Sequence, residues 1–296
     1  MNYTDYLQRI LFEDIDARCV VVRLESVLAE VARRCSDAPP AARQLLAEAL
    51  LLSAAMSSGL KFSGRISLQI RADSGPIRIL VADCTDQGGL RGTVSVQADA
   101  PLPEQAADWI EPLRKDAVLT LTLDPSDGGQ RWQGIVPFEG SNLAEAVAGY
   151  FERSEQLPTL ISLASDGDAA AAIMLQRMPG DGSDAQAWEH LEQLLATVRD
   201  EELLTLPPEQ LLHRLFHAER RRLFPARELT FHCPCSRERV ENMLLSLGPD
   251  ELNSMAEEAE PVEVHCQFCN QGYRFEPDEL AALYPDDAVQ GSPTLH

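Results

Sequence analysis

Four of the seven cysteines lie close together near the C-terminal end, and their spacing constrains this region more than any other feature of the chain. Cys233 and Cys235 flank a single proline, and Cys266 and Cys269 follow after 30 intervening residues. Two short-spaced cysteine pairs on opposed turns are a common way to offer four thiolates to a tetrahedral zinc ion. The sequence therefore predicts that Cys233, Cys235, Cys266 and Cys269 bind one zinc ion per chain.

The residues around the second pair support this interpretation. The stretch CQFCNQGYRF is typical of a zinc knuckle, in which Gly272 would let the chain reverse before a strand carrying Tyr273 and Phe275. His232 and His265 each precede a cysteine, but four thiolates already complete a tetrahedral ligand set.

The remaining cysteines, Cys19, Cys35 and Cys84, are scattered along the chain, and we interpret them as small buried hydrophobic residues. The same interpretation is weaker for the four clustered cysteines, which lie in two tight pairs among polar neighbours such as Arg237 and Asn270.

A zinc site of this kind has two possible roles, and the cysteines alone do not decide between them. A segment of ~50 residues has too small a core to fold unaided, and zinc bound by thiolates can supply ~10–16 kcal/mol of folding free energy. The site can therefore be purely structural. Thiolates are also the groups that oxidants attack, so oxidation would remove the ligands and with them the support of the segment.

Composition excludes several classes of function. The 296 residues carry a formal net charge of −22, which opposes binding to nucleic acid or to anionic membranes. No apolar run is long enough to span a membrane, and the N-terminus lacks the features of a signal peptide, so we expect a cytoplasmic protein. The glycine-rich stretches at 86–92 and 127–134 are typical of hairpin turns, and no nucleotide-binding loop is expected.

Residues 1–178 are predicted to form one mixed domain that contains an antiparallel meander. Alternating apolar residues such as Ile66, Leu68 and Ile70 indicate strands at 65–71, 77–83 and 90–97. A hairpin is expected over 117–137, and further strands over 18–24, 158–165 and 170–178. Helices are expected over 27–34, 39–59 and 142–156.

The segment 179–227 follows. It begins with a boundary, PGDGSDAQ (179–186), and the rest of it is predicted to be largely helical. Its first helix carries an apolar stripe that consists of Trp188, Leu191, Leu194, Leu195 and Val198. A second helix is expected over 210–224, with the basic run 220–222 on its solvated face. The segment is too small to form its own core, so the stripe must pack on another part of the chain or stay loose. A permanent core helix remains an alternative interpretation of the stripe.

At this point the residues resemble a known family. HCPCSRERVENML, the 30-residue spacing, VHCQFCNQGYRF, LKFSGRISLQI and YFERSEQLPT are similar to the bacterial thirty-three-kilodalton heat-shock protein family, the redox-regulated holdase chaperones. The resemblance covers nearly the whole chain. One difference is Val240, at a position where the family often has a further cysteine.

The resemblance implies an α+β fold with three parts: a chaperone core at 1–178, a redox-responsive helical linker at 179–227 and a small zinc-binding domain at 228–296. It also implies a non-enzymatic chaperone that is inactive while reduced and zinc-bound. Oxidants would convert the ligands to disulfides Cys233–Cys235 and Cys266–Cys269, zinc would be released, and the oxidised chain would form a homodimer. That form would bind unfolding client proteins without ATP.

Two rival functions remain to be weighed. A thiol–disulfide oxidoreductase would place Cys266 and Cys269 at the start of a helix, whereas NQGYRF predicts a turn and a strand. A zinc-ribbon nucleic-acid binder would need a basic surface. Residues 227–275 instead hold four arginines and nine acidic residues, a net charge of −5.

Overall fold

The computed structural model describes residues 4–35, 37–61, 63–97, 102–180, 185–258 and 260–283. These residues form two compact units, Met1–His232 and Cys233–His296. Of the boundary predicted at 179–186, residues 181–184 lie outside the described ranges, as do residues 284–296 of the predicted zinc domain.

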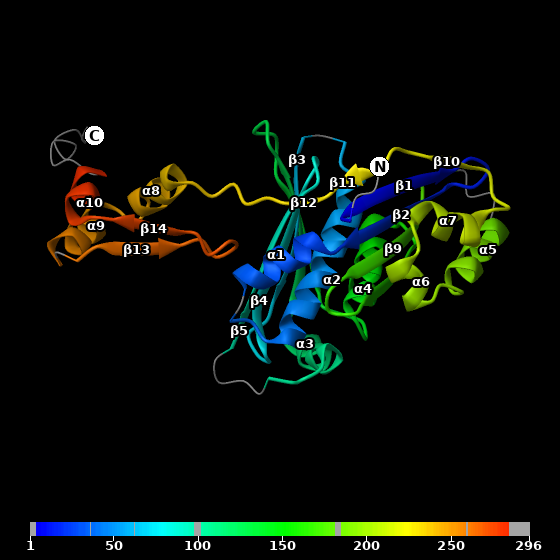
Figure 1. The fold of residues 1–296 in the computed structure, drawn as a ribbon, viewed down its shortest axis with the longest axis horizontal. Helices are drawn as coiled ribbons and strands as arrows, with labels where there is room; N and C mark the ends of the chain where they lie inside the picture. Colours follow the sequence, from blue (N-terminus) through cyan, green and yellow to red (C-terminus); the bar gives the residue numbers. More distant parts are fainter. Residues whose placement is uncertain are drawn as a thin grey trace, which may run out of the picture. The chain divides into compact units, whose positions relative to one another are not determined.

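The first unit contains two sheets with helices around them (Figure 1). Its strands are β1 Tyr6–Phe12, β2 Ala17–Leu24, β3 Gly64–Arg71, β4 Ile77–Thr85, β5 Gly89–Val96, β6 Val118–Pro125, β7 Trp132–Pro137, β8 Thr159–Ser165, β9 Ala170–Arg177, β10 Arg221–Leu223, β11 Arg227–Glu228 and β12 Thr230–Phe231. Its helices are α1 Ser26–Arg34, α2 Pro40–Ser57, α3 Ile110–Asp116, α4 Leu143–Tyr150, α5 Ala185–Leu195, α6 Asp200–Thr205 and α7 Pro208–Phe216, with a 3-10 turn at Ala106–Trp109 and a π-helical turn at Phe151–Glu155.

The first sheet has the strand order β10-β1-β2-β9-β8, and β11 also pairs with β1. The second sheet has the order β12-β5-β4-β3-β6-β7. Neighbouring strands are antiparallel except β12 and β5, which are parallel. The mixed α+β class, the predicted meander (β3–β5) and the predicted hairpin (β6–β7) are confirmed.

Helix α2 lies in the main core, between the two sheets. Its residues are buried along nearly its whole length, and the same hydrophobic cluster contains Val22 of the first sheet and Leu68 of the second. A helix that is apolar on all sides is stable only when it is enclosed in this way. Glu48 is a half-buried acidic residue of this helix, and burial raises its pKa to about 7.

The first sheet is buried on both faces, which explains the unbroken apolar runs 19–22 in β2 and 170–175 in β9. Val20 and Val22 point into the main core, while Cys19 and Val21 between them belong to a second hydrophobic cluster on the opposite face. Successive side chains of a strand point to opposite faces, so a sheet covered on both sides needs continuous apolar sequence.

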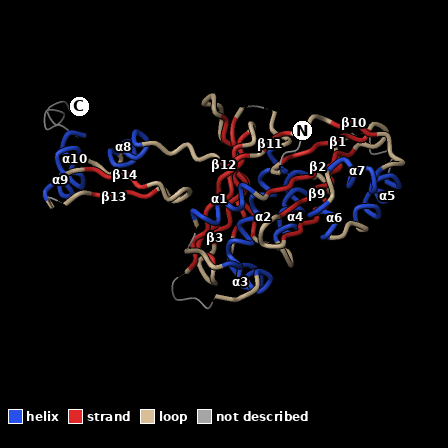
Figure 2. Tube along the Cα trace, viewed as in Figure 1, coloured by secondary structure: helices blue, strands red, loops and turns tan. Residues whose placement is uncertain are grey.

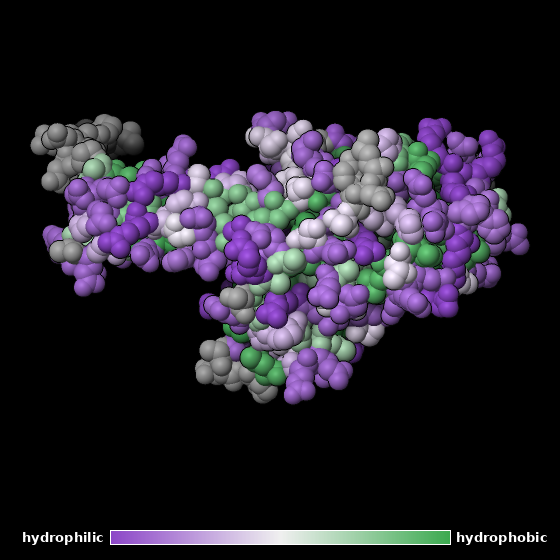
Figure 3. Space-filling view, viewed as in Figure 1, coloured by the Kyte–Doolittle hydropathy of each residue, from purple (hydrophilic) through white to green (hydrophobic). Residues whose placement is uncertain are grey.

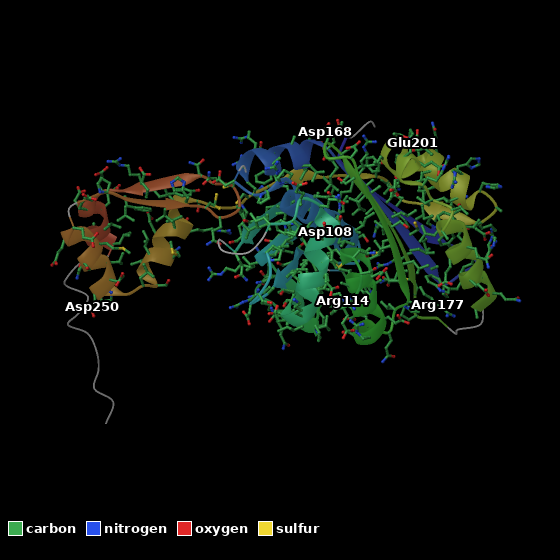
Figure 4. The ribbon with its side chains drawn as sticks, turned by 90° about the horizontal axis from the view of Figure 1, so that it is seen from below. Asp108, Arg114, Asp168, Arg177, Glu201 and Asp250 are labelled. Carbon is green, nitrogen blue, oxygen red and sulfur yellow. The ribbon has the colours of Figure 1, made fainter. Side chains whose placement is uncertain are left out.

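Helices α5, α6 and α7 cover this second face. Trp188, Leu191 and Leu195 of the predicted stripe are buried in the second cluster, and Leu194 and Val198 pack against it. Phe216 at the end of α7 meets Phe12 of β1 edge to face, with ring centroids 5.2 Å apart. The outer surface over these helices is largely hydrophilic in Figure 3. In Figure 4 the helices lie alongside β9, which ends at the labelled Arg177 and begins two residues after the labelled Asp168.

Two sequence predictions in this unit need correction. The helix expected over 210–224 ends at Phe216, and Arg221 and Arg222 of the basic run belong to strand β10 instead of a helix face. Pairing of β10 with β1 outweighs the helical pattern there. Strand β1 itself was not predicted, because the polar residues Gln8 and Arg9 interrupt its apolar pattern, although Gln8 is buried.

The second unit, taken by itself, contains helices α8 Arg237–Leu245, α9 Pro249–Glu257 and α10 Pro277–Leu283 and a hairpin of β13 Val262–His265 and β14 Gly272–Phe275. Its core is small and consists of Val240, Leu244, Leu252, Phe275 and Leu280, with partly buried neighbours. Every helix within the described ranges of the chain is too short or too polar to span a bilayer.

Candidate metal centre

The first pair of cysteines lies in the loop between β12 and α8, drawn in tan in Figure 2. Pro234 separates Cys233 from Cys235, and Ser236 then begins the helix: its side chain accepts a hydrogen bond from the Arg239 amide. A serine N-cap fixes where α8 starts. The loop therefore ends at a defined position immediately after Cys235.

The second pair lies in the tight turn between β13 and β14. The Asn270 amide donates to the Cys266 carbonyl at 2.8 Å, and the Cys266 amide donates to the Gln271 carbonyl at 3.0 Å. Asn270 adopts the left-handed conformation, with φ 55°. The chain reversal predicted at Gly272 lies at Asn270 instead, because Gly272 is already the first residue of β14. Asparagine tolerates this conformation because its short polar side chain can hydrogen-bond locally.

The two turns bring the four sulfurs together. The Sγ atoms of Cys235 and Cys269 are 3.2 Å apart, those of Cys233 and Cys266 are 3.7 Å apart, and all four lie within 4.8 Å of one another. A tetrahedron with metal–sulfur distances of ~2.3 Å has edges of ~3.8 Å. The four thiols therefore fit a single metal ion with tetrahedral coordination.

The thiols do not share one electrostatic environment. Burial raises the pKa of Cys269, which is 5% exposed. Burial also acts to raise the pKa of Cys235, but hydrogen bonds from Tyr273 and the neighbouring thiols outweigh it and lower that pKa. The hydrogen bond with Cys235 in turn raises the pKa of Tyr273 to about 12. The pKa values of Cys235 and Tyr273 thus depend on each other through this hydrogen bond.

Comparison with known proteins identifies the family to which the chain belongs. The model of the family described as Hsp33 protein matches residues 5–276, which is most of the chain. This chain belongs to the Hsp33 family. It is 42% identical over 303 residues to the 33 kDa chaperonin of Pseudomonas paraeruginosa, with 100% of each chain covered. It is 38% identical to the 33 kDa chaperonin of Methylobacillus flagellatus, with 98% of this chain and 97% of that protein covered.

A solved Hsp33 structure gives the same result for the fold. The crystal structure of the 33 kDa chaperonin from Thermotoga maritima superimposes with a TM-score of 0.80 at 27% identity, covering 94% of this chain and 97% of that one. The family and the names of these relatives support a chaperone as the class of protein.

The other three cysteines of this Hsp33 chain lie in the first unit. Cys19 and Cys84 are buried and Cys35 is half-buried, and all three are free thiols. Burial raises the pKa of Cys84 to about 11 and also raises the pKa values of Cys19 and Cys35. Among the described residues, the only group of three or more possible metal ligands found together is the four clustered cysteines, and it includes neither His232 nor His265.

Arg237 holds together the elements around the two cysteine turns, a role that the sequence did not predict. Its guanidinium lies over the ring of Phe275 at 4.3 Å, donates to the Arg274 carbonyl at 2.8 Å and pairs with Glu279 at 2.7 Å. One side chain thus connects the start of α8 with β14 and α10. The only signal in the sequence is its position two residues after Cys235, and its partners become apparent only in the folded unit.

Proposed function

We propose that this Hsp33 chain is a redox-regulated holdase chaperone. In the reduced state Cys233, Cys235, Cys266 and Cys269 bind one Zn²⁺ per chain and the chaperone is inactive. Oxidation of the four thiolates releases zinc and activates the chain, which then binds unfolded or partly unfolded client proteins, without ATP, and prevents their aggregation under oxidative stress. The chaperone class itself rests on the family and on the names of the relatives.

The observation that carries the proposal is the combination of four convergent thiols and a minimal core. The four sulfurs lie within 4.8 Å of one another in a unit whose described residues form a core of five buried side chains. A core of this size supplies little folding free energy, whereas zinc bound by thiolates supplies ~10–16 kcal/mol. Loss of the ligand set is then sufficient to unfold the unit, which couples its order to the redox state.

The chemistry balances with hypochlorous acid as the oxidant. Two thiolates, one proton and one hypochlorous acid molecule yield one disulfide, one chloride and one water, so two oxidant molecules consume all four thiolates. We assign the products as Cys233–Cys235 and Cys266–Cys269, the pairing implied by the family resemblance. The separations of 3.2 and 3.7 Å connect other combinations, Cys235 with Cys269 and Cys233 with Cys266. All four sulfurs are within reach of one another, so closest approach alone does not select the pairs.

The physical consequence of each pairing favours the local one. Disulfides that crossed between the turns would close loops of 33 and 34 residues and stabilise the folded unit by ~4 kcal/mol each. Local disulfides leave the two turns free to separate. Only local pairing therefore converts oxidation into unfolding.

Unfolding of the zinc unit would release the segment before it. In this proposal the chain has a chaperone core at 1–178, a linker at 179–227 and a redox-switch domain at 228–296. The amphipathic helix α5 buries Trp188, Leu191 and Leu195 on the first sheet while its other face is polar, so both surfaces would become apolar on separation. The oxidised chain would form a homodimer. We further propose a cytoplasmic protein that binds neither nucleic acid nor membranes, in keeping with its charge of −22.

The local structure of the second turn disfavours the rival oxidoreductase. Cys269 is followed by Asn270 in the left-handed conformation and then by strand β14. No helix begins at this pair, so the helix N-terminus that activates such enzymes is absent from this turn.

Zinc content and chaperone activity measured on one preparation test the proposal. Reduced protein should contain one zinc per chain and fail to suppress aggregation of a heat-unfolding client. Protein treated with hypochlorous acid should lose the zinc and suppress aggregation in the absence of ATP. If zinc is lost without any gain of activity, the centre is purely structural.

A further inference from the structure

The segment 220–232, here called the strap, joins the linker helices to the first metal-binding turn. It runs along the edge of the first sheet, where β10 and β11 pair with β1, and then crosses to the second sheet, where β12 pairs with β5 (Figure 1). The strap thus adds a strand to the edge of each sheet. Helix α7 precedes it, and Cys233 is the next residue after it.

Main-chain hydrogen bonds hold the strap. The Phe224 amide donates to the Arg9 carbonyl at 3.1 Å, and the Leu229 amide donates to the Asp5 carbonyl at 3.1 Å. The next residue changes sheets, because the Thr230 amide donates to the Gly88 carbonyl at 3.0 Å. These bonds require an extended chain but no particular side chains.

Three apolar side chains of the strap enter sites on the core. Phe224 lies under the guanidinium of Arg9, 4.8 Å from its ring centroid. Leu229 is 2% exposed and belongs to the main core. Phe231 packs against that core and lies under Arg34 at 4.7 Å. An extended segment with apolar residues two apart, as at Leu229 and Phe231, therefore has a prepared position on the second sheet.

Gly88 shows how closely the strap approaches. A Cβ atom at this residue would lie 2.5 Å from the Glu228 carbonyl oxygen, and its φ of +90° also favours glycine. The turn before β5 is thus shaped to admit an extended backbone.

The strap is basic, and the edge that it covers is acidic. It contains four arginines (220, 221, 222 and 227) and one glutamate, a net charge of +3, in a chain whose total is −22. Arg220 pairs with Asp14 at 3.2 Å and with Glu13 at 3.5 Å, and Arg222 pairs with Glu13 at 3.5 Å. The guanidinium of Arg227 donates to the Asp86 carbonyl at 2.6 Å.

Without the strap, β1 and β5 would become sheet edges with unpaired amides and carbonyls, next to sites for aromatic and aliphatic side chains. We propose that the strap is an internal stand-in for a client: once it leaves, these two edges bind extended, basic, apolar segments of unfolded proteins by strand addition. The proposal rests on the proposed holdase function and adds to it a binding surface and a class of ligand. Exposed sheet edges are general templates for such pairing.

The position of the strap explains how its release would be controlled. It is held at one end by the packed helices α5–α7 and at the other by the metal-binding turn. When both neighbours unfold, the strap alone must offset the entropy of its own ordering. A client segment then competes with it for the same edges.

A labelled peptide of the strap sequence, RRRLFPARELTFH, tests the proposal. It should bind the full-length oxidised protein at least tenfold more tightly than the reduced zinc protein, and more weakly as salt concentration rises. It should also reduce the suppression of client aggregation by the oxidised protein.

A matched pair of modified peptides isolates strand pairing. The amide of Phe224 donates to β1, and the alternation of an antiparallel ladder directs the adjacent Leu223 amide away from β1. N-methylation at Phe224 should weaken binding at least tenfold, and N-methylation at Leu223 should weaken it twofold or less. Equal effects would overturn the strand-addition mode.

The outcomes also separate this proposal from the function on which it rests. If oxidised protein suppresses aggregation but neither binds the peptide nor is inhibited by it, the strap proposal is wrong and the holdase function stands. If oxidised protein suppresses no aggregation, the proposed function itself is wrong. If the peptide dissociates the oxidised dimer while aggregation suppression is unchanged, the occupant of the edges is a second copy of this chain, and the client proposal is overturned.

Discussion

The sulfurs of Cys235 and Cys269 lie 3.2 Å apart, although 34 residues separate them in the sequence. They come from two different turns, one before α8 and one between β13 and β14. The described residues of the second unit form only a small core, which is not large enough to force this approach. Four thiols that meet in this way could hold one metal ion.

Replacement of any clustered cysteine should therefore abolish stable zinc binding. Cys235→Ser should lower zinc content from one per chain to a small fraction, because three ligands lose most of the affinity of four. Zinc released from purified reduced protein and measured with a colorimetric chelator checks this. Cys35→Ser is the matched control, since Cys35 is half-buried and lies in the other unit. Full zinc retention in Cys235→Ser would contradict the assignment.

Disulfide mapping after oxidation distinguishes the two possible pairings. We expect Cys233–Cys235 and Cys266–Cys269, together with new protease-sensitive bonds between about 180 and 290, while the core up to about 178 stays resistant. Crossed disulfides would keep the zinc unit folded and resistant. Mass spectrometry of the digested protein reports both the pairs and the cleavage sites, and unchanged resistance of the C-terminal part would refute the order–disorder switch.

The sequence was sufficient for features that depend on local pattern. Alternation at Ile66, Leu68 and Ile70 predicted β3, and the spacing of four cysteines predicted a site that brings their sulfurs together. It failed where tertiary pairing decides the outcome. Residues 221–224 continue a helical pattern, but β1 offers an edge with which residues 221–223 pair as strand β10.

The residues that surround and support the four cysteines could not be predicted from the sequence either. Tyr273 lowers the pKa of Cys235, and Arg237 joins α8 to β14 and α10, only because these elements fold together. Neither residue type has a spacing rule relative to a metal ligand. The apolar run 170–175 of β9 is typical of a strand covered on both faces, but the sequence does not indicate which helices cover it.

ATP should have no effect on the activity. In the glycine-rich stretch 86–92, residues 86–88 form the turn between β4 and β5 and the rest begin β5, and the stretch 127–134 leads into β7. Purified protein should hydrolyse no ATP, and aggregation suppression by oxidised protein should be the same with and without it. An ATPase activity that copurifies with the chain and is lost on mutation of either turn would overturn this prediction.

Glu48 should make the first unit less stable as pH rises. Burial raises its pKa to about 7 from its usual 4.5, so between these values the folded chain holds a proton that the unfolded chain has released. The stabilisation is complete below pH 4.5 and is lost as pH rises through 7, by at most about 3 kcal/mol. Glu48→Gln should therefore stabilise the protein at pH 8 and have little effect at pH 4.5. Denaturant unfolding of both proteins at each pH checks this, and an equal difference at the two values would contradict it.

The linker helix α5 offers a test of activation that bypasses the cysteines. Leu194 packs against the second cluster, whereas its neighbour Gln193 is exposed on the same helix. Leu194→Asp places a charge against the first sheet and should weaken docking of α5 by about 1–3 kcal/mol. Because the metal ligands are untouched, the variant should keep one zinc per chain and yet suppress client aggregation while reduced. Gln193→Asp adds the same charge without touching the sheet, so it should keep the chaperone inactive until it is oxidised. Zinc content, protease sensitivity of α5 and aggregation suppression, all measured under reducing conditions, separate the two variants. If Leu194→Asp frees α5 to proteolysis without any gain of activity, undocking of the linker is not what activates the chain.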